Sequence, residues 1–298
     1  MPKRDVHLLP MLALGTAGCL WGTGFYFGKI SLNEMPVPTM VLFRFIFACA
    51  GLLPVIFFDR PRFARGEWGW VLAASLLGVP VQYLVQFKGL SLTTVSHASL
   101  MVATLPMLLA IAAVIFSGER LHVGGWVALV ASTAGAALIA LSSSAASGVA
   151  RPSIRGDMLV VFSMFAAIAW ILISKRLMQR HSAMMVTACV YWIGMLLLAA
   201  VVLFTFGTPS VHYSTRAWIA VAEQGLLATA STTLLWNWGL KRVPASRAGI
   251  FVNLEPLVGA ILGVSLLHEV LGIPALAGGA LIVGAAVYFS YKPENSIE

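Results

Sequence analysis

Charged residues are scarce in this chain of 298 residues. Asp, Glu, Lys and Arg together make up 10% of the sequence, whereas a soluble globular domain carries about 25%. Hydrophobic residues make up 59%, and the mean hydropathy is +0.91. These proportions exclude an ordinary soluble domain and indicate an integral membrane protein.

Cysteine is rare, and the common catalytic motifs are missing. Cys19, Cys49 and Cys189 lie in apolar segments without CxxC spacing, so the sequence predicts neither a disulfide framework nor a zinc site. The absence of HExxH, G-x-S-x-G and an acidic metal cluster argues against a membrane-embedded enzyme. Because no G-x-x-x-x-G-K-[ST] loop occurs, ATP is not the direct energy source. We expect no cofactor and no metal.

Apolar stretches long enough to cross a bilayer recur along the whole chain. A transmembrane helix needs about 20 apolar residues. The longest loop, Ser142 to Asp157, lies at the midpoint and is typical of a linker. We therefore expect an all-α integral membrane protein with ten transmembrane helices: Leu9 to Gly28, Val37 to Phe58, Trp68 to Phe87, Val95 to Phe116, Val123 to Leu141, Met158 to Ser174, Met184 to Phe206, Trp218 to Leu240, Ala248 to Leu267 and Pro274 to Tyr291.

The basic residues fall in clusters between the apolar stretches. The net charge is +8, but clusters in short loops are explained by membrane topology, so we expect no nucleic-acid partner. With a cytoplasmic N-terminus, thirteen of the 19 Lys and Arg residues lie on the cytoplasmic side and five on the other. This bias predicts an even number of crossings, with both termini in the cytoplasm.

The second half of the chain repeats the first. With an offset of 149, Trp21 pairs with Trp170, and an offset of 150 pairs Gly89 with Gly239, Ser96 with Ser246, Pro106 with Pro256 and Glu119 with Glu269. Five spans in each half is an odd number, so the two halves would cross the membrane in opposite directions. The sequence therefore predicts two inverted five-helix repeats, residues 1–148 and 149–298, around a central cavity.

The last span of each half is rich in small residues at four-residue spacing. Small residues allow helices to approach closely in lipid, so we expect these spans to serve packing, in a monomer rather than a dimer. The residues are Ala128, Ser132, Ala136 and Ala140 in one span and Ala280 and Gly284 in the other.

Several of these residues resemble the EamA-type family of the drug/metabolite transporter superfamily. They are Trp21-Gly22 with Phe25 and Lys29, Arg44, Leu254-Glu255-Pro256, and Glu269. The resemblance implies ten helices, both termini in the cytoplasm, and export or exchange of small metabolites through a central cavity. Leu105 occupies the position that matches Glu255, so the first half lacks the corresponding carboxylate. Within the superfamily the chain looks most like bacterial exporters of amino acids, including aromatic ones. This resemblance implies a multi-pass protein of the bacterial inner membrane.

Glu255 and Arg44 are the two charged residues inside the predicted spans that we single out for a role in transport. A carboxylate there costs a few kcal/mol unless it is paired, protonated or facing water, which marks Glu255 as a candidate for proton coupling or for binding a substrate amine. Two alternatives stay open: Glu255 satisfies backbone groups freed by Pro256, or it forms an ion pair with Arg44. For Arg44 the sequence leaves three roles open: snorkelling toward the membrane surface, structural pairing with a carboxylate, or binding a substrate carboxylate through two hydrogen bonds.

Polar and aromatic residues inside the other spans indicate a surface that faces a cavity rather than lipid. Rings supply apolar contact while amides and hydroxyls fix orientation, which suits an amphipathic small molecule such as an amino acid. Glu119 and Glu269 lie near span ends, where we expect helix capping or loop contacts. The candidate cavity residues are Trp21, Phe25, Tyr26, Gln82, Tyr83, Gln86, His97, Ser99, Trp170, Ser174, Tyr191, Thr232, Trp236 and Asn253.

The predicted mechanism is alternating access, in which the two halves rock about the cavity. Helix-interrupting residues would act as hinges: Gly22, Gly24, Pro80, Pro106 and Pro256. An alternative within the same superfamily is export of drugs or nucleotide-linked sugars. A membrane-embedded enzyme and a channel are alternatives of other classes, and the sequence shows no filter-like loop for a channel.

Overall fold

The computed structural model describes residues 5–58, 63–92, 101–144, 153–267 and 273–291. These residues form helices and short connections, without a strand. In chain order the helical elements are α1 (Asp5–Leu32), α2 (Val37–Phe58), η1 (Arg65–Glu67), α3 (Trp68–Leu76), η2 (Leu77–Val81), α4 (Gln82–Leu92), α6 (Leu105–Ser117), α7 (Val123–Ser144), α8 (Ile154–Met178), α9 (Ala183–Phe206), α10 (Thr215–Gly225), η3 (Leu226–Ser231), α11 (Thr232–Leu240), α12 (Ala245–Ala248), η4 (Gly249–Asn253), α13 (Leu254–Leu267) and α14 (Ile273–Tyr291).

Five helical stretches of the described residues are long and apolar enough to cross a membrane, by length and composition: Leu8–Leu32, Val37–Phe57, Arg65–Leu92, Ile154–Met178 and Ala183–Phe206. Shorter apolar helices cover Leu105–Ser117, Val123–Ile139 and Leu276–Ser290. The predicted all-helical class is confirmed by these elements. The ten-span topology stays a prediction.

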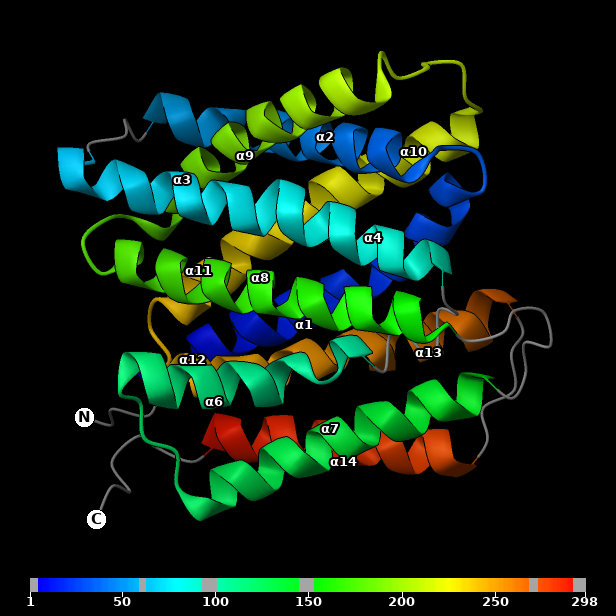
Figure 1. Cartoon of the computed structure of the whole chain (residues 1–298). Coiled ribbons are helices and arrows are strands. Elements are labelled where there is room, and N and C mark those ends of the chain that lie inside the picture. The colour runs from blue at the N-terminus through cyan, green and yellow to red at the C-terminus, as the bar shows by residue number, and fades with distance from the viewer. Residues whose placement is uncertain (1–4, 59–62, 93–100, 145–152, 268–272, 292–298) are drawn as a thin grey trace.

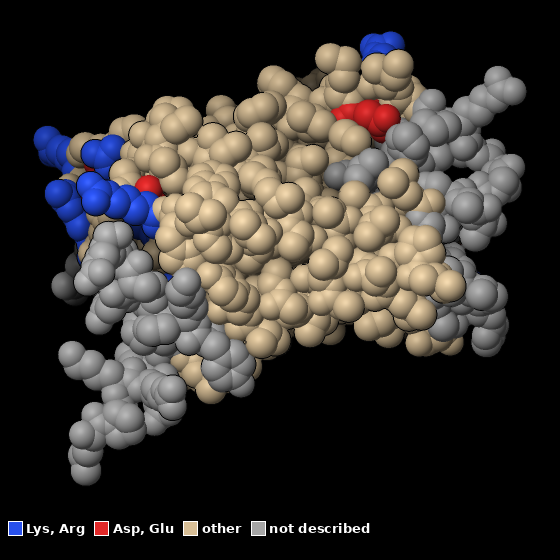
Figure 2. All heavy atoms as spheres, turned by 90° about the horizontal axis from the view of Figure 1, so that it is seen from below, with Lys and Arg blue, Asp and Glu red and all other residues tan. Residues whose placement is uncertain are grey.

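The long helices run side by side in one bundle (Figure 1). Helices α2 and α9 lie at one edge of this view, α7 and α14 at the opposite edge, and α1 runs between them. On the face shown in Figure 2, a wide band carries no charged side chain, and most Lys and Arg side chains gather at one end of the bundle. An uncharged band between polar ends is what a membrane-spanning bundle requires.

Two of the helical stretches contain a π-helical segment in the middle. Segment η2 begins at Leu77 and segment η3 at Leu226, the same offset of 149 that pairs Trp21 with Trp170. In η2, Pro80 has no N–H to donate to a carbonyl in the preceding turn. The hydroxyls of Thr229 and Ser231 in η3, and of Thr232 directly after it, each donate to a carbonyl five residues earlier. Such segments are frequent at functional sites.

The ninth predicted span is not one continuous helix. The stretch from Ala248 to Leu267 instead passes from α12 through the 3₁₀ segment η4 into α13. The physical reason is Pro256, which has no N–H for the carbonyl of Val252 and also disfavours the helical conformation of the residue before it. The break places Glu255 in the first turn of α13.

Helices α7 and α14 pack closely through small residues, as the sequence predicts for the last span of each half. A Cβ on Gly135 would lie 2.5 Å from the carbonyl oxygen of Gly278, so only glycine allows this approach. Ser132 and Ala136 of α7 are buried as expected. The expected stripe on α14 is wrong, because Ala280 and Gly284 are exposed and Gly278 makes the contact.

We expect the substitution Gly135→Leu to lower the melting temperature of the purified protein by roughly 5 °C or more, because overpacking costs about 1–3 kcal/mol. Thermal unfolding in detergent, followed by the loss of the monodisperse elution peak, measures this. The control is Gly284→Leu in α14, where an added Cβ meets nothing within 4 Å. Equal melting temperatures for the two variants would contradict the assigned contact.

Candidate functional site

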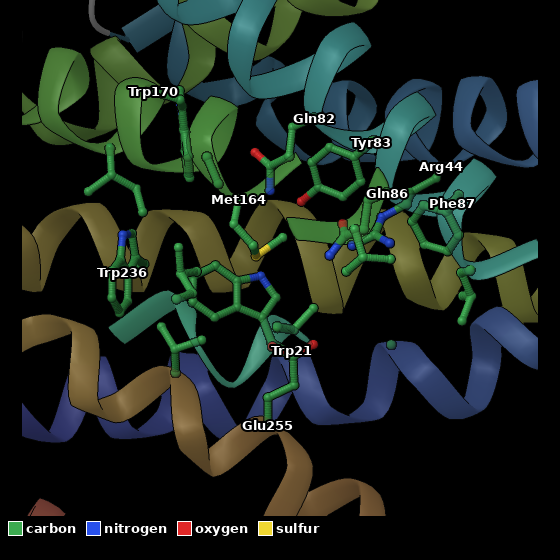
Figure 3. A pocket seen from close by; sticks show the side chains of 18 residues that line it. Trp21, Arg44, Gln82, Tyr83, Gln86, Phe87, Met164, Trp170, Trp236 and Glu255 are labelled. Carbon is green, nitrogen blue, oxygen red and sulfur yellow. The ribbon is translucent and has the colours of Figure 1, made fainter. Parts of the chain in front are cut away.

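A cavity of about 90 Å³ lies inside the bundle. Aromatic and aliphatic side chains form most of its wall, and the charged residues among them are Arg44 and Glu255. Figure 3 shows Gln82, Tyr83, Gln86 and Arg44 on one side of the cavity and Trp21 and Glu255 on the other. The lining residues are Trp21, Gly24, Arg44, Gln82, Tyr83, Gln86, Phe87, Leu90, Val102, Leu105, Val160, Met164, Ala167, Trp170, Ile171, Trp236, Val252 and Glu255.

Arg44 is held by neutral partners on α10 and η3. Its Nε donates to the hydroxyl of Thr229 at 2.7 Å, Nη1 donates to Gln224 Oε1 at 3.3 Å, and Nη2 donates to the carbonyl of Ala228 at 3.5 Å. The guanidinium carbon lies 4.8 Å from the ring centre of Tyr83. The π-helical segment therefore positions Arg44, since both Thr229 and Ala228 belong to it.

Arg44 and Glu255 do not form an ion pair. No nitrogen of Arg44 lies within 4 Å of a Glu255 carboxylate oxygen, although both side chains line the same cavity. Glu255 comes from the first turn of α13, and Arg44 from the middle of α2. The alternative in which these residues lock two helices together is wrong for this conformation. Two opposite charges instead face one cavity from different helices.

Two polar atoms of the cavity wall are buried without a partner among the described residues. Trp236 Nε1 can only donate a hydrogen bond, and Gln82 Oε1 can only accept one. The ring of Trp236 lies 5.1 Å from that of Trp21, centre to centre. Buried polar groups without partners are rare, so a donor and an acceptor beside a cavity point to a ligand that carries the complementary groups.

The structure brings eight of the predicted residues into the cavity wall: Trp21, Arg44, Gln82, Tyr83, Gln86, Trp170, Trp236 and Glu255. Five others lie elsewhere. The Tyr191 hydroxyl is 2.7 Å from Thr233 Oγ1, and Thr232 donates to the Leu227 carbonyl, so both stabilise the bundle behind the wall. Asn253 donates to Ser132 on α7, and Ser174 is buried outside the cavity. Tyr26 packs against the ring of Phe27.

Three predicted residues cannot be placed at the cavity. His97 and Ser99 lie outside the described residues. Phe25 belongs to α1, but its side chain is not among those that the structure describes. Sequence reasoning also missed cavity residues whose side chains carry no chemical signal, such as Met164 and Ile171. A further omission is Glu223 on α10. The sequence did contain a signal for Glu223, because a carboxylate inside the predicted span from Trp218 to Leu240 marks a candidate functional residue.

Glu119 joins three parts of the chain near the end of α6. Its Oε1 accepts from Lys175 Nζ at 2.8 Å and from the Ala245 N–H at 2.9 Å, and Oε2 accepts from the N–H and hydroxyl of Ser246. The predicted capping role is confirmed for Glu119, while Glu269 lies outside the described residues. Burial raises the pKa of Glu119, but Lys175 and the donated hydrogen bonds outweigh it and leave the pKa below its ordinary value.

A helical bundle whose internal cavity is lined by aromatic rings and two charged residues is typical of a membrane protein that binds a small molecule. The model of the EamA-like transporter family matches this chain twice, over residues 8–141 and 154–291. The chain therefore belongs to the EamA-like transporter family, whose members are integral membrane transporters. The predicted family resemblance is confirmed at this level.

Similar proteins carry transporter names. The chain is 24% identical over 295 residues to an uncharacterized transporter of Archaeoglobus fulgidus, covering 98% of this chain and 99% of the relative. It is 23% identical over 280 residues to the biotin transporter of Escherichia coli K12, covering 92% and 90%. A protein crystal structure with 20% identity superimposes with a TM-score of 0.80 over 96% of this chain and 99% of the other, which shows the fold. These names indicate a transporter rather than an enzyme.

Proposed function

We propose that the protein is a secondary transporter that exports amino acids, including aromatic ones, by alternating access. Two inverted repeats, residues 1–148 and 149–298, would move about the cavity, with both termini in the cytoplasm of a bacterial cell. Two matches to one family model support the duplication, as do two π-helical segments at one offset. The basic end of the bundle supports the assigned orientation.

The observation that carries the substrate proposal is the separation of Arg44 and Glu255 within one cavity. A zwitterion places its carboxylate on a guanidinium and its ammonium on a carboxylate, and each contact is a charge-assisted hydrogen bond. Rings of Trp21, Tyr83 and Trp170 lie in the same wall and supply apolar contact for a side chain. The donor on Trp236 and the acceptor on Gln82 would fix its orientation.

The size of the cavity supports a moving transporter. Its volume is about 90 Å³, whereas pockets that hold small organic ligands measure roughly 300–1,000 Å³. An amino acid therefore fits only after the surrounding helices separate. The segments η2, η3 and η4 interrupt the helices that carry Tyr83, Trp236 and Glu255. Interruptions of this kind allow one part of a helix to tilt against the other.

Counterflow in proteoliposomes tests the proposal. Vesicles loaded with unlabelled amino acid should take up labelled amino acid faster than empty vesicles, with saturable kinetics. A screen of amino acids should favour large apolar and aromatic side chains. Flux that never saturates would indicate a pore, and an absence of flux for every amino acid would overturn the assigned substrate class.

We expect Glu255→Gln to raise the KM for phenylalanine roughly 10-fold or more, because one charge-assisted hydrogen bond contributes about 1.5–3 kcal/mol. The KM for 3-phenylpropionate, which has the same ring and carboxylate but no ammonium group, should change little. The matched control is Glu34→Gln, whose carboxylate bonds Ser214 outside the cavity. An equal rise in KM for both compounds would contradict the contact between Glu255 and the ammonium.

Biotin is a second candidate substrate, because one relative is named a biotin transporter. Biotin carries a carboxylate for Arg44, an apolar chain and a ring system, but no ammonium group. Counterflow of biotin that survives Glu255→Gln, together with no counterflow of amino acids, would favour this alternative.

A further inference from the structure

A second carboxyl group lies within the helices, outside the cavity wall. Glu223 lies eight residues after Thr215, the first residue of α10. At 1.5 Å per residue it is about 12 Å from the start of that helix. Its Oε1 lies 2.7 Å from the hydroxyl oxygen of Thr23 on α1. Its Oε2 is shielded from solvent and has no hydrogen-bond partner among the described residues. Inside a bundle of apolar helices, an ionised carboxylate is strongly unfavourable when one of its oxygens is buried without a hydrogen bond.

The hydroxyl of Thr23 satisfies only one oxygen of Glu223, and only in part. This hydroxyl lies 2.7 Å from Glu223 Oε1 and 2.7 Å from the carbonyl oxygen of Leu20. Both oxygens accept, so the single hydroxyl hydrogen of Thr23 is shared between them. Oε2 has no hydrogen-bond partner among the described residues. A proton on Glu223 removes the charge that these buried oxygens would otherwise carry.

Arg44 connects this carboxyl to the cavity. Gln224 follows Glu223 on α10, and its Oε1 accepts from Arg44 Nη1 at 3.3 Å. Helices α1 and α2 both pack against α10. The described titratable side chains on these two helices are Cys19, Tyr26, Arg44 and Cys49, and of these only Arg44 is a cation. A positive guanidinium favours the ionised form of Glu223, and a substrate carboxylate bound to Arg44 would cancel that effect.

We propose that Glu223 binds the proton that is transported together with the substrate. This proposal rests on the proposed function, because it needs a substrate carboxylate at Arg44. The substrate strengthens proton binding, and by linkage the proton strengthens substrate binding to the same extent. Glu223 takes up the proton on the side where the substrate binds and releases it on the side where the substrate leaves. Because a proton leaves with each substrate, export requires an outward gradient of substrate that exceeds the opposing gradient of protons.

An imposed pH gradient tests the coupling. With the membrane potential clamped, proteoliposomes of the natural protein placed in a medium one pH unit more acidic than their interior should accumulate labelled phenylalanine. One proton per substrate allows up to about tenfold accumulation per pH unit. In Glu223→Gln the ratio of this accumulation to counterflow should fall about tenfold, while Glu34→Gln should keep the ratio. Counterflow without pH-driven accumulation in the natural protein would overturn the coupling and leave the carrier function standing.

Infrared spectroscopy of the purified protein tests the proton without any transport. At neutral pH the natural protein should show a protonated carboxyl band that Glu223→Gln removes and Glu34→Gln does not. Thr23→Val removes the hydroxyl that donates to Oε1. It should shift this band to higher frequency, because the C=O group of the carboxyl loses a hydrogen bond. If Glu223→Gln fails to fold, the frequency shift in Thr23→Val still tests whether the band belongs to Glu223. The proposal would be overturned if the natural protein showed no protonated carboxyl band. It would also be overturned if Thr23→Val left the frequency of this band unchanged.

Discussion

Replacing Arg44 by Gln is expected to raise the KM for counterflow of every carboxylate substrate. Arg44 is 5% exposed, and the hydrogen-bonding partners of its guanidinium are neutral. Its charge is therefore available to a substrate carboxylate at the cavity. Losing a charge-assisted contact costs about 1.5–3 kcal/mol, which raises the KM roughly 10- to 100-fold. Arg44→Lys keeps the charge but not the planar fork that reaches Thr229, Gln224 and Ala228, so it should recover only part of the activity.

The control for Arg44 separates its binding role from stability. Arg242→Gln removes an exposed guanidinium that stacks on Trp238 and should leave counterflow unchanged. Melting temperatures of both variants should be measured beside the transport assay. Counterflow by Arg44→Gln at the rate of the natural protein would show that the substrate carboxylate binds elsewhere.

Replacing Glu119 by Ala is expected to lower the free energy of unfolding by about 2–3 kcal/mol, or the melting temperature by roughly 5 to 10 °C. The substitution leaves the ammonium of Lys175 without its carboxylate and the N–H groups of Ala245 and Ser246 without their acceptor. The side chains of Lys175 and Glu119 are 19% and 13% exposed. We therefore place the loss below that of a fully buried ion pair.

The contribution of Glu119 to the free energy of unfolding depends on pH. The folded-state pKa of Glu119 lies below its ordinary value of 4.5, so the folded state binds fewer protons than the unfolded state in that range. The contribution of Glu119 to stability is complete above pH 4.5 and is lost as the pH falls through the lower folded-state value. Thermal unfolding of Glu119→Gln should show a weaker decline over the same acidic range.

A double-mutant cycle isolates the pair from the capping contacts. Glu119→Gln, Lys175→Met and the double variant should give a coupling free energy, because the two side chains are in direct contact. Strictly additive losses would contradict an energetic role for the ion pair. Glu34→Ala, at an exposed carboxylate that accepts hydrogen bonds from Ser214, should change the melting temperature little.

The elements that the sequence predicted well depend on local properties. Helix α2 has the predicted bounds, Val37 to Phe58, because twenty apolar residues in a membrane have few alternatives to a helix. The capping role of Glu119 followed from its position at a span end. The break before α13 was visible in Pro256, yet the sequence did not reveal a 3₁₀ turn at Gly249 to Asn253.

The failures concern side-chain direction. A polar residue inside a span can face a cavity, another helix or its own backbone, and its type does not distinguish these. Asn253 was placed at the cavity but donates to Ser132, and Thr232 bonds the carbonyl of Leu227. Conversely, Glu223 went unnoticed because its significance comes from Thr23, a residue 200 positions away.

The sequence alone determined the membrane environment, the helical class and the family, since each depends on composition, apolar length and motifs spread along the chain. Tertiary structure decided which residues form the cavity, and it separated Arg44 from Glu255 while it joined Glu223 to Thr23. The physical reason is that hydrogen bonds and charge separations depend on distances between helices. Those distances are set by packing at positions such as Gly135 and Gly278, which can be evaluated only when both helices are in place.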